Sequence, residues 1–233
     1  KGNTILKNCA IEPEIKDLVS FLLKLGCKIK WTGKRSLKIS GVKEIKEISY
    51  SVMFDRIEAG TYLIAAALTE GNLQIKNVIP KIIKTEIDIL KKVSAKIKVT
   101  PNKITIIGNN RIKSLRIQTS PCPGFPTGLQ AQIMVLLCKA NKKSIIREDI
   151  FENRFMHVAE LNRMGAQILT NGNKAVVKGN INFVPAELMA TDLRASVSLV
   201  LAALTAKGKS VINRIYHLDR GYENIEKKLK KIG

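Results

Sequence analysis

The sequence predicts an α/β protein built from a repeated unit of helix, strand, helix, strand and strand. Three stretches rich in small apolar residues begin at Asp55, Pro126 and Thr191, roughly 70 residues apart, and each reads as a helix followed by a polar turn and a strand. Three pairs of short segments alternate apolar and polar residues at a period of two, as half-buried strands do. Together these observations indicate a fold made of equivalent units.

The elements of each unit follow in the same order. Single strands after the small-residue helices are expected at Leu73–Val78, Ser144–Arg147 and Ser210–Arg214. Amphipathic second helices are expected at Pro13–Leu25, Lys81–Val93, Asn153–Met164 and Asp219–Ile232. The closing strand pairs are expected at Gly26–Lys30 with Ser36–Ser40, Ala95–Val99 with Lys103–Ile107, and Gly165–Leu169 with Lys174–Val177.

The segment from Thr119 to His157 stands out. It opens with closely spaced prolines and a glycine, which predict a rigid extended loop. Thr127 is then expected to be the N-cap of a helix, with Gln130 in the capping-box position. The residues Phe151 to His157 place an acid, an amide, a cation and an imidazole side by side, a density typical of a site wall.

Composition restricts the class of protein. The chain has 233 residues, of which 45% are apolar, so it can bury a substantial core. The formal net charge of +21 would favour a nucleic acid or an anionic membrane as partner. The lysines are scattered, however, and the aromatic content of 5% leaves few stacking platforms. We therefore expect neither of these partners.

The cysteines and histidines indicate no metal site. Cys9, Cys27, Cys122 and Cys138 show neither CxxC spacing nor the density of a disulfide scaffold, and neither histidine is spaced for metal binding with them. We find no signal-peptide pattern and no apolar run of about 20 residues. These features predict a cytoplasmic protein.

Four motifs resemble the enolpyruvyl transferase family, in its cell-wall branch. They are TSPCPGFPTGLQAQ from Thr119, IFENRFMHVAELNRMGA from Ile150, MATDLRASVSLVLAAL from Met189 and NRIYHLDRGYENIEKKL from Asn213. The resemblance implies an inverted α/β prism, in which two domains of three repeats each flank the active site. The repeat pattern agrees with it independently.

By this resemblance the chain corresponds to the second half of such an enzyme. Residues 1–52 are expected to finish a domain whose first part is missing, and residues 53–233 to form the second domain without its last strands. The prism would then be incomplete, and a separate N-terminal half becomes a possible partner.

The family reaction moves the enolpyruvyl group of phosphoenolpyruvate onto the 3′-hydroxyl of UDP-N-acetylglucosamine, and it implies no cofactor. Arg194 and Arg220 match arginines of the phosphoenolpyruvate site, where a guanidinium fork suits a carboxylate or phosphate. Alternatively, each arginine pairs with its neighbour Asp192 or Asp219. Asp192 also stands where an N-cap is expected, and both of its roles are compatible.

The remaining site residues follow from the same resemblance. Two interpretations stay open for Glu152, which either caps a helix that starts at Asn153 or faces the reacting carbon. The positions expected to line the nucleotide-sugar pocket are Glu12, Arg56, Thr127, Gly128 and Ile150. Asp55 and Glu58 are assigned to the start of a helix, and His157 and His217 are weaker candidates with a structural role preferred.

The chain departs from the family pattern at two points. Gly128 stands where the family has the aspartate assigned to deprotonating the sugar hydroxyl, and loss of a general base costs on the order of 10²- to 10⁴-fold in rate. The family's loop cysteine and its lysine at the phosphoenolpyruvate site belong to the half that this sequence lacks. Cys122 is interpreted as a rigid-loop residue.

Alternatives to catalysis follow from these departures. A non-catalytic remnant could keep the fold and bind a nucleotide sugar or a partner protein. The shikimate-pathway branch of the family is a second enzyme hypothesis, although FENRFMH and HLDRGYE fit the cell-wall branch better.

Overall fold

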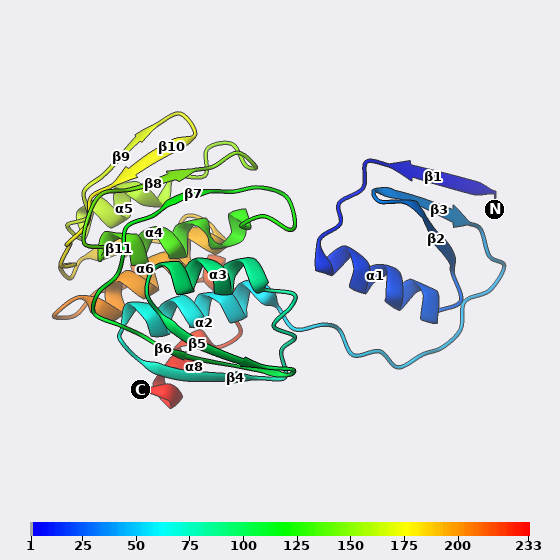
Figure 1. The fold of residues 1–233 in the computed structure, drawn as a ribbon, viewed down its shortest axis with the longest axis horizontal. Helices are drawn as coiled ribbons and strands as arrows, with labels where there is room; N and C mark the ends of the chain where they lie inside the picture. The colour runs from blue at the N-terminus through cyan, green and yellow to red at the C-terminus, as the bar shows by residue number, and fades with distance from the viewer. Residues whose placement is uncertain (1) are drawn as a thin grey trace. The chain divides into compact units, whose positions relative to one another are not determined.

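The computed structural model describes residues 2–233, which form two compact units (Figure 1). One unit contains the chain up to Phe54 together with Pro121–Pro123. The other contains Asp55–Ser120 and Gly124–Gly233. No helix within residues 2–233 has the length and apolar character needed to cross a bilayer.

The first unit is a small antiparallel sheet with one helix. Its elements are β1 (Asn3–Lys7), α1 (Pro13–Lys24), β2 (Lys28–Gly33) and β3 (Ser36–Ser40), and the strand order is β1-β3-β2. Pro13 begins α1 because the first helical position has no intrahelical partner for an amide hydrogen. Val19 of α1 and Leu37 of β3 supply its buried apolar side chains. The predicted helix and strand pair are confirmed.

Three helices form the centre of the second unit: α2 (Arg56–Leu68), α4 (Gln130–Cys138) and α6 (Leu193–Thr205). They pack against one another, and every residue of α4 is buried. They begin in the three stretches singled out in the sequence. The small alanine side chains of α2 and α6 allow close approach, whereas α4 contributes larger apolar side chains. A helix that is apolar on all sides is stable only inside a core.

Three sheets surround these helices (Figure 1). The first has the order β4-β6-β5, with β4 (Asn72–Lys76), β5 (Lys96–Thr100) and β6 (Lys103–Ile107). The second has the order β7-β8-β10-β9, with β7 (Arg116–Gln118), β8 (Ser144–Arg147), β9 (Ile168–Asn171) and β10 (Lys174–Val177). The third pairs β11 (Glu187–Met189) with β12 (Val211–Asn213) in parallel. The predicted strand pairs form antiparallel hairpins, whereas β7 and β11 are additional strands.

The second helices of the units are shorter than predicted. They are α3 (Lys84–Lys92), α5 (His157–Arg163), α7 (Tyr216–Asp219) and α8 (Ile225–Ile232). The prediction of a helix from Asn153 is wrong, because Asn153 has a left-handed backbone with φ of 53°. The single helix predicted from Asp219 is also wrong, since Asn224, with φ of 47°, separates α7 from α8.

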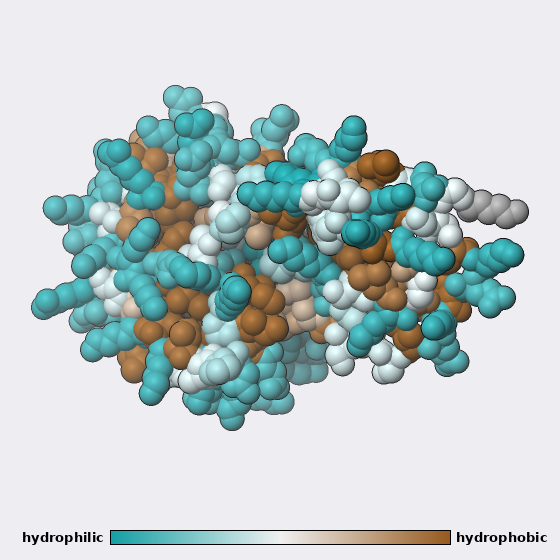
Figure 2. All heavy atoms as spheres, turned by 45° about the vertical axis from the view of Figure 1, so that its right-hand side comes forward, coloured by the Kyte–Doolittle hydropathy of each residue, from teal (hydrophilic) through white to brown (hydrophobic). Residues whose placement is uncertain are grey.

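The surface is predominantly polar. Figure 2 shows hydrophilic side chains over much of the visible face, with hydrophobic atoms exposed between them. Solvent-exposed lysines occur on several strands, including Lys28, Lys38, Lys96 and Lys98. The basic charge is therefore dispersed over different elements.

Candidate functional site

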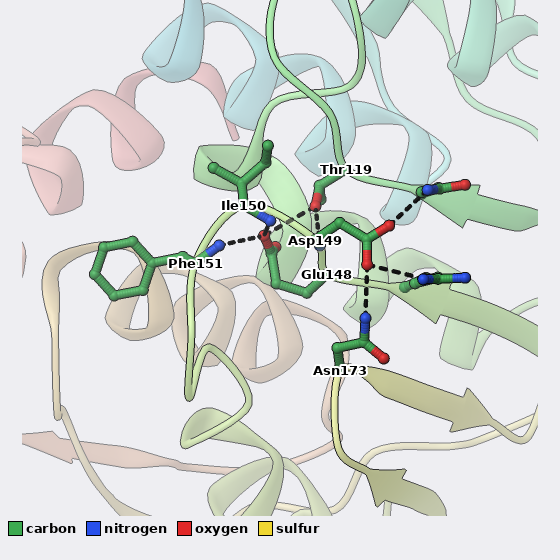
Figure 3. A network of polar contacts seen from close by, with 8 residues as sticks. Thr119, Glu148, Asp149, Ile150, Phe151 and Asn173 are labelled. Atoms are coloured by element: carbon green, nitrogen blue, oxygen red, sulfur yellow. Dashed lines mark hydrogen bonds and ion pairs between the residues drawn. The ribbon is translucent and has the colours of Figure 1, made fainter.

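A buried carboxylate organises the loop that follows β8 (Figure 3). Glu148 is 3% exposed, and its Oε1 accepts hydrogen bonds from Thr119 Oγ1 at 2.8 Å and from the amides of Ile150 and Phe151 at 2.9 and 3.0 Å. Its Oε2 accepts a hydrogen bond from Thr127 Oγ1 at 2.9 Å. Glu148 thereby joins the ends of β7 and β8 to the segment that enters α4.

This contact changes the assignment of Thr127. The residue starts the 3-10 helix η1 (Thr127–Leu129), and its side chain caps no helix, so the predicted N-cap is wrong. Gln130 does not complete a capping box either, because its side chain is fully buried and neither polar atom has a partner among the described residues. Thr127, itself a predicted substrate residue, is instead held by Glu148 through its hydroxyl.

Asp149 extends the network to the β9–β10 turn. Its carboxylate accepts hydrogen bonds from Arg147 Nε at 2.9 Å, Gln118 Nε2 at 2.5 Å and Asn173 Nδ2 at 2.6 Å. The hydrogen bond from Arg147 is the main cause that lowers the pKa of Asp149. The Glu148 amide donates to the Asn173 carbonyl at 2.8 Å. Side chain and backbone together hold this loop in one shape.

A hollow of about 480 Å³ lies beside the network. It is lined by residues 148–155 together with Gly172 and Asn173. Its wall therefore includes Ile150, which is 42% exposed, and the acid, amide and cation that the sequence singled out. The cavity is large enough for a small organic ligand.

Glu152 is exposed on this wall and caps no helix, because α5 begins only at His157. The capping interpretation is therefore wrong, and a role at the reacting carbon stays a prediction. Arg154, two residues later, lies over the Phe151 ring with its guanidinium carbon 5.0 Å from the ring centroid. This contact holds the cation against the wall of the hollow.

His157 lies inside the core and not on a surface. It is 1% exposed, and burial lowers its pKa to about 4, so the imidazole is neutral at physiological pH. Its Nε2 has no hydrogen-bond partner among the described residues. These surroundings agree with the structural role preferred from the sequence.

The start of α6 carries two predicted site residues. Asp192 is the N-cap, and its Oδ1 accepts hydrogen bonds from the amides of Arg194 and Ala195, each at 2.8 Å. The cap predicted from the sequence is confirmed. Arg194 is half-buried, and its Nη1 donates to the hydroxyl of Tyr222 at 3.3 Å. Arg194 thus belongs to the first turn of α6, and the positive end of the helix dipole at that turn favours an anion.

Arg220 lies next to this helix start. It is exposed and follows α7, and the next residue is Gly221. A Cβ atom at Gly221 would be 2.6 Å from Leu193 Cδ1, so a glycine lets this segment pack against the first residue of α6. The fold therefore brings the segments of Arg194 and Arg220 together.

Gly128 lies against α2. A Cβ atom at this position would be 3.1 Å from Ile57 Cδ1, which is tight but not prohibitive. The Gly128 carbonyl accepts a hydrogen bond from Gln132 Nε2 at 2.9 Å. This chain thus has no carboxylate at the position of the family base, and the Ile57 side chain packs beside it.

Three further predicted residues, Arg56, Asp55 and Glu12, already have partners. Arg56 is 9% exposed and forms an ion pair with Glu86 at 3.3 Å. Asp55 caps α2 through the amides of Ile57 and Glu58, as predicted. In the first unit, Glu12 Oε1 accepts a hydrogen bond from the Cys122 amide at 3.3 Å. A role for Arg56 and Glu12 in ligand binding stays a prediction.

Sequence reasoning missed Glu148 and the residues around Tyr222. Ser144 and Ile146 of β8 and Glu148 directly after it are alternate residues and all buried, so a period of two would have pointed Glu148 inward. No comparable signal marks Gln132 or Thr61, because their helices are buried on nearly all sides and the apolar spacing singles out no one face. Within residues 2–233 no group of three potential metal ligands comes together.

Comparisons with known proteins agree with this arrangement. The family model described as EPSP synthase (3-phosphoshikimate 1-carboxyvinyltransferase) matches residues 1–229. The chain is 73% identical over 233 residues to UDP-N-acetylglucosamine 1-carboxyvinyltransferase from Pelagibacter ubique (strain HTCC1062) and 50% identical to the enzyme of that name from Geotalea uraniireducens (strain Rf4). Each alignment covers 100% of this chain and 56% of the relative, so the chain spans about half the length of these relatives.

Solved structures confirm the predicted fold class. The enolpyruvyl transferase NikO from Streptomyces tendae is similar with a TM-score of 0.91 and 26% identity, over 100% of this chain and 56% of NikO. EPSP synthase from Acinetobacter baumannii shares the fold with a TM-score of 0.75 and 17% identity, over 100% of this chain and 57% of that protein. One conclusion accounts for the motifs, the repeats, the family match and these similar folds. The chain belongs to the EPSP synthase family of enolpyruvyl transferases.

Proposed function

We propose that this chain supplies substrate-binding residues for transfer of the enolpyruvyl group of phosphoenolpyruvate to the 3′-hydroxyl of UDP-N-acetylglucosamine. The reaction would serve the first committed step of peptidoglycan synthesis in the cytoplasm. Relatives 73% and 50% identical are named for this carboxyvinyl transfer. The observation that carries the proposal is Arg194 at the capped amino end of α6, beside the segment of Arg220.

These two arginines would hold phosphoenolpyruvate. The substrate carries a carboxylate and a phosphate, and each needs a cation placed before the reaction starts. Arg194 carries a positive charge in the first turn of the 13-residue helix α6, and the dipole of that helix adds positive potential at the same end. Arg220 is exposed and free to reach an anion at the surface of the unit.

The wall built on Glu148 would take the nucleotide sugar. Thr127 and Ile150 are both fixed by Glu148, one through its side chain and the other through its amide. A preformed wall lowers the entropy lost when a ligand binds. The Ile150 side chain remains exposed for contact.

The addition step needs one proton removed and one added, and the elimination step needs one more removed. The sugar oxygen forms a bond to C2 of phosphoenolpyruvate while its proton leaves, and an acid protonates C3. In the second step C3 loses a proton, and the C2–O bond to phosphate breaks. Asp192 and Glu152 are the carboxylates of this chain that we assign to these proton transfers, since Gly128 has no group that titrates.

The missing carboxylate at Gly128 specifically favours a second function, which is nucleotide-sugar or partner binding without turnover. The two functions differ in one measurement. A binding protein would give heat on calorimetric titration with UDP-N-acetylglucosamine but would release no phosphate from phosphoenolpyruvate.

Phosphate release is the direct test. It is measured with both substrates for the chain alone and for the chain mixed with the other part of the Pelagibacter ubique relative. The variant Gly128→Asp is added together with Ile57→Val, because valine lacks the Cδ1 atom that crowds the new Cβ. We expect release with the added part, increased on the order of 10²-fold or more by the aspartate. No release under any of these conditions would remove the catalytic proposal.

A further inference from the structure

We propose that Tyr222 is a positioning residue for Arg194, and that buried hydrogen bonds through Gln132 tie this arginine to the backbone of Gly128. The inference rests on the proposed function, because it assigns to Arg194 the binding of an anionic substrate. The sequence motifs gave no role to Tyr222, Thr61 or Gln132.

Tyr222 is fixed by its ring. The residue is fully buried, and its cluster includes Val197, Leu218 and Ile225. The hydroxyl at the other end of the ring meets Arg194 Nη1 at 3.3 Å, and the guanidinium carbon lies 5.7 Å from the ring centroid. The packed ring of Tyr222 therefore holds its hydroxyl oxygen in a fixed position beside the flexible Arg194 side chain.

The directions of the hydrogen bonds are set by Thr61. Its Oγ1 donates its single hydrogen to the Ile57 carbonyl at 2.8 Å, so it can only accept from other groups. The 2.9 Å contact between Thr61 Oγ1 and the Tyr222 hydroxyl must then be donated by Tyr222. This leaves both lone pairs of the Tyr222 oxygen free to accept, and one of them faces Arg194.

Gln132 extends the chain of hydrogen bonds to Gly128. Its Nε2 donates to the Gly128 carbonyl at 2.9 Å, which fixes the orientation of the amide because a carbonyl cannot donate. The second hydrogen of Nε2 is shared between Thr61 Oγ1 at 3.2 Å and the Tyr222 hydroxyl at 3.3 Å. All three side chains, Thr61, Gln132 and Tyr222, are buried to 1% exposure or less.

The result is one connection across the three central helices. Thr61 belongs to α2, Gln132 to α4 and Arg194 to α6. A phenylalanine at position 222 would keep the ring packing but would offer no lone pair to the guanidinium. Arg194 would then lose the contact that sets its direction, whereas the helix cap at Asp192 would remain.

The first test needs no substrate. The Nε–Hε signals of the arginines are recorded by ¹⁵N NMR for the unliganded chain, with Arg194 assigned through the variant Arg194→Lys. We expect Tyr222→Phe to shift or broaden the Arg194 signal. The control is Tyr62→Phe, because the Tyr62 hydroxyl is buried without a partner among the described residues and its loss removes no hydrogen bond. An Arg194 signal unchanged in Tyr222→Phe would overturn the inference.

The second test measures affinity for phosphoenolpyruvate by titration. We expect Tyr222→Phe to weaken binding about three- to tenfold, the range for loss of one hydrogen bond, and Tyr62→Phe to leave it unchanged. In the Arg194→Lys background the Tyr222 change should have no further effect if it acts through the arginine. An equal loss in both backgrounds would contradict the positioning role. An unmodified chain that binds no phosphoenolpyruvate, with the NMR effect intact, would contradict the proposed function and support the positioning of Arg194.

Discussion

Glu148 and Glu152 lie four residues apart in one loop and have opposite surroundings. Glu148 is buried and accepts hydrogen bonds from three segments of the chain, whereas Glu152 is exposed on the wall of the hollow. A buried carboxylate is stable only when its oxygens are fully satisfied. Glu148 therefore belongs to the scaffold of the site, and Glu152 is free to meet a ligand.

Replacing Glu148 with glutamine should destabilise the second unit by about 1–3 kcal/mol. The amide oxygen can replace Oε1, but the amide nitrogen then faces Thr127, and the hydrogen bonds lose the assistance of the negative charge. Urea unfolding measures the change. The matched control is Glu152→Gln, which should stay within about 0.5 kcal/mol of the unmodified chain because its side chain is exposed. Equal effects of the two variants would show that Glu148 does not hold the loop.

At the scale of elements, α2 and α6 begin in the same way. Asp55 and Asp192 are their N-caps, and each carboxylate accepts hydrogen bonds from the amides two and three residues later. Both caps were predicted from sequence, since aspartate before an apolar helix is a strong signal. Asp55 precedes Arg56, which pairs with Glu86, whereas Asp192 stands two residues before Arg194, the arginine predicted to bind phosphoenolpyruvate.

Because the two caps are alike, variants of Asp55 and Asp192 can distinguish a structural role of Asp192 from a chemical one. Asparagine caps a helix as well as aspartate does, so Asp192→Asn should change stability by less than about 0.5 kcal/mol, whereas Asp192→Ala should cost about 1 kcal/mol. If Asp192 transfers a proton, Asp192→Asn should still lower phosphate release on the order of 10²-fold or more. Asp55→Asn serves as the control and should change neither quantity. Unaltered release in Asp192→Asn would limit Asp192 to the cap.

The errors of the sequence interpretation have local physical causes. Periodicity located the buried helices and the hairpins, because burial imposes the pattern directly. It failed at Asn153 and Asn224, where a left-handed residue interrupts a helical pattern without changing its apolar spacing. It also missed β7 and β11, since three residues are too few to show alternation. The partner of Thr127 could not be predicted, because Glu148 approaches from 21 residues away.

At the scale of the whole molecule, the sheets of the second unit are unequal copies of one pattern. In one sheet β7 lies parallel to β8, and in another β11 lies parallel to β12. The other edge of β8 is covered by the β9–β10 hairpin, whereas β12 pairs only with β11 within residues 2–233. We propose that a strand pair covers this edge of β12 in proteins of the relatives' full length, which completes the domain expected over residues 53–233.

Hydrogen exchange at two matched amides tests this proposal. The amides of Ile145 and Val211 donate to equivalent carbonyls, those of Leu115 and Ala186, on the parallel side of their strands. Successive backbone amides of a strand point to opposite sides. The Ile146 amide therefore points toward β10, and the Ile212 amide points toward the open edge of β12. In the 233-residue chain the Ile212 amide should exchange at least about tenfold faster than that of Ile146. When the chain is extended with the segment that follows the aligned region in the Pelagibacter ubique relative, Ile212 should become protected while Ile146 stays unchanged. Ile212 amides that exchange equally fast with and without the extension would show that the β12 edge remains open.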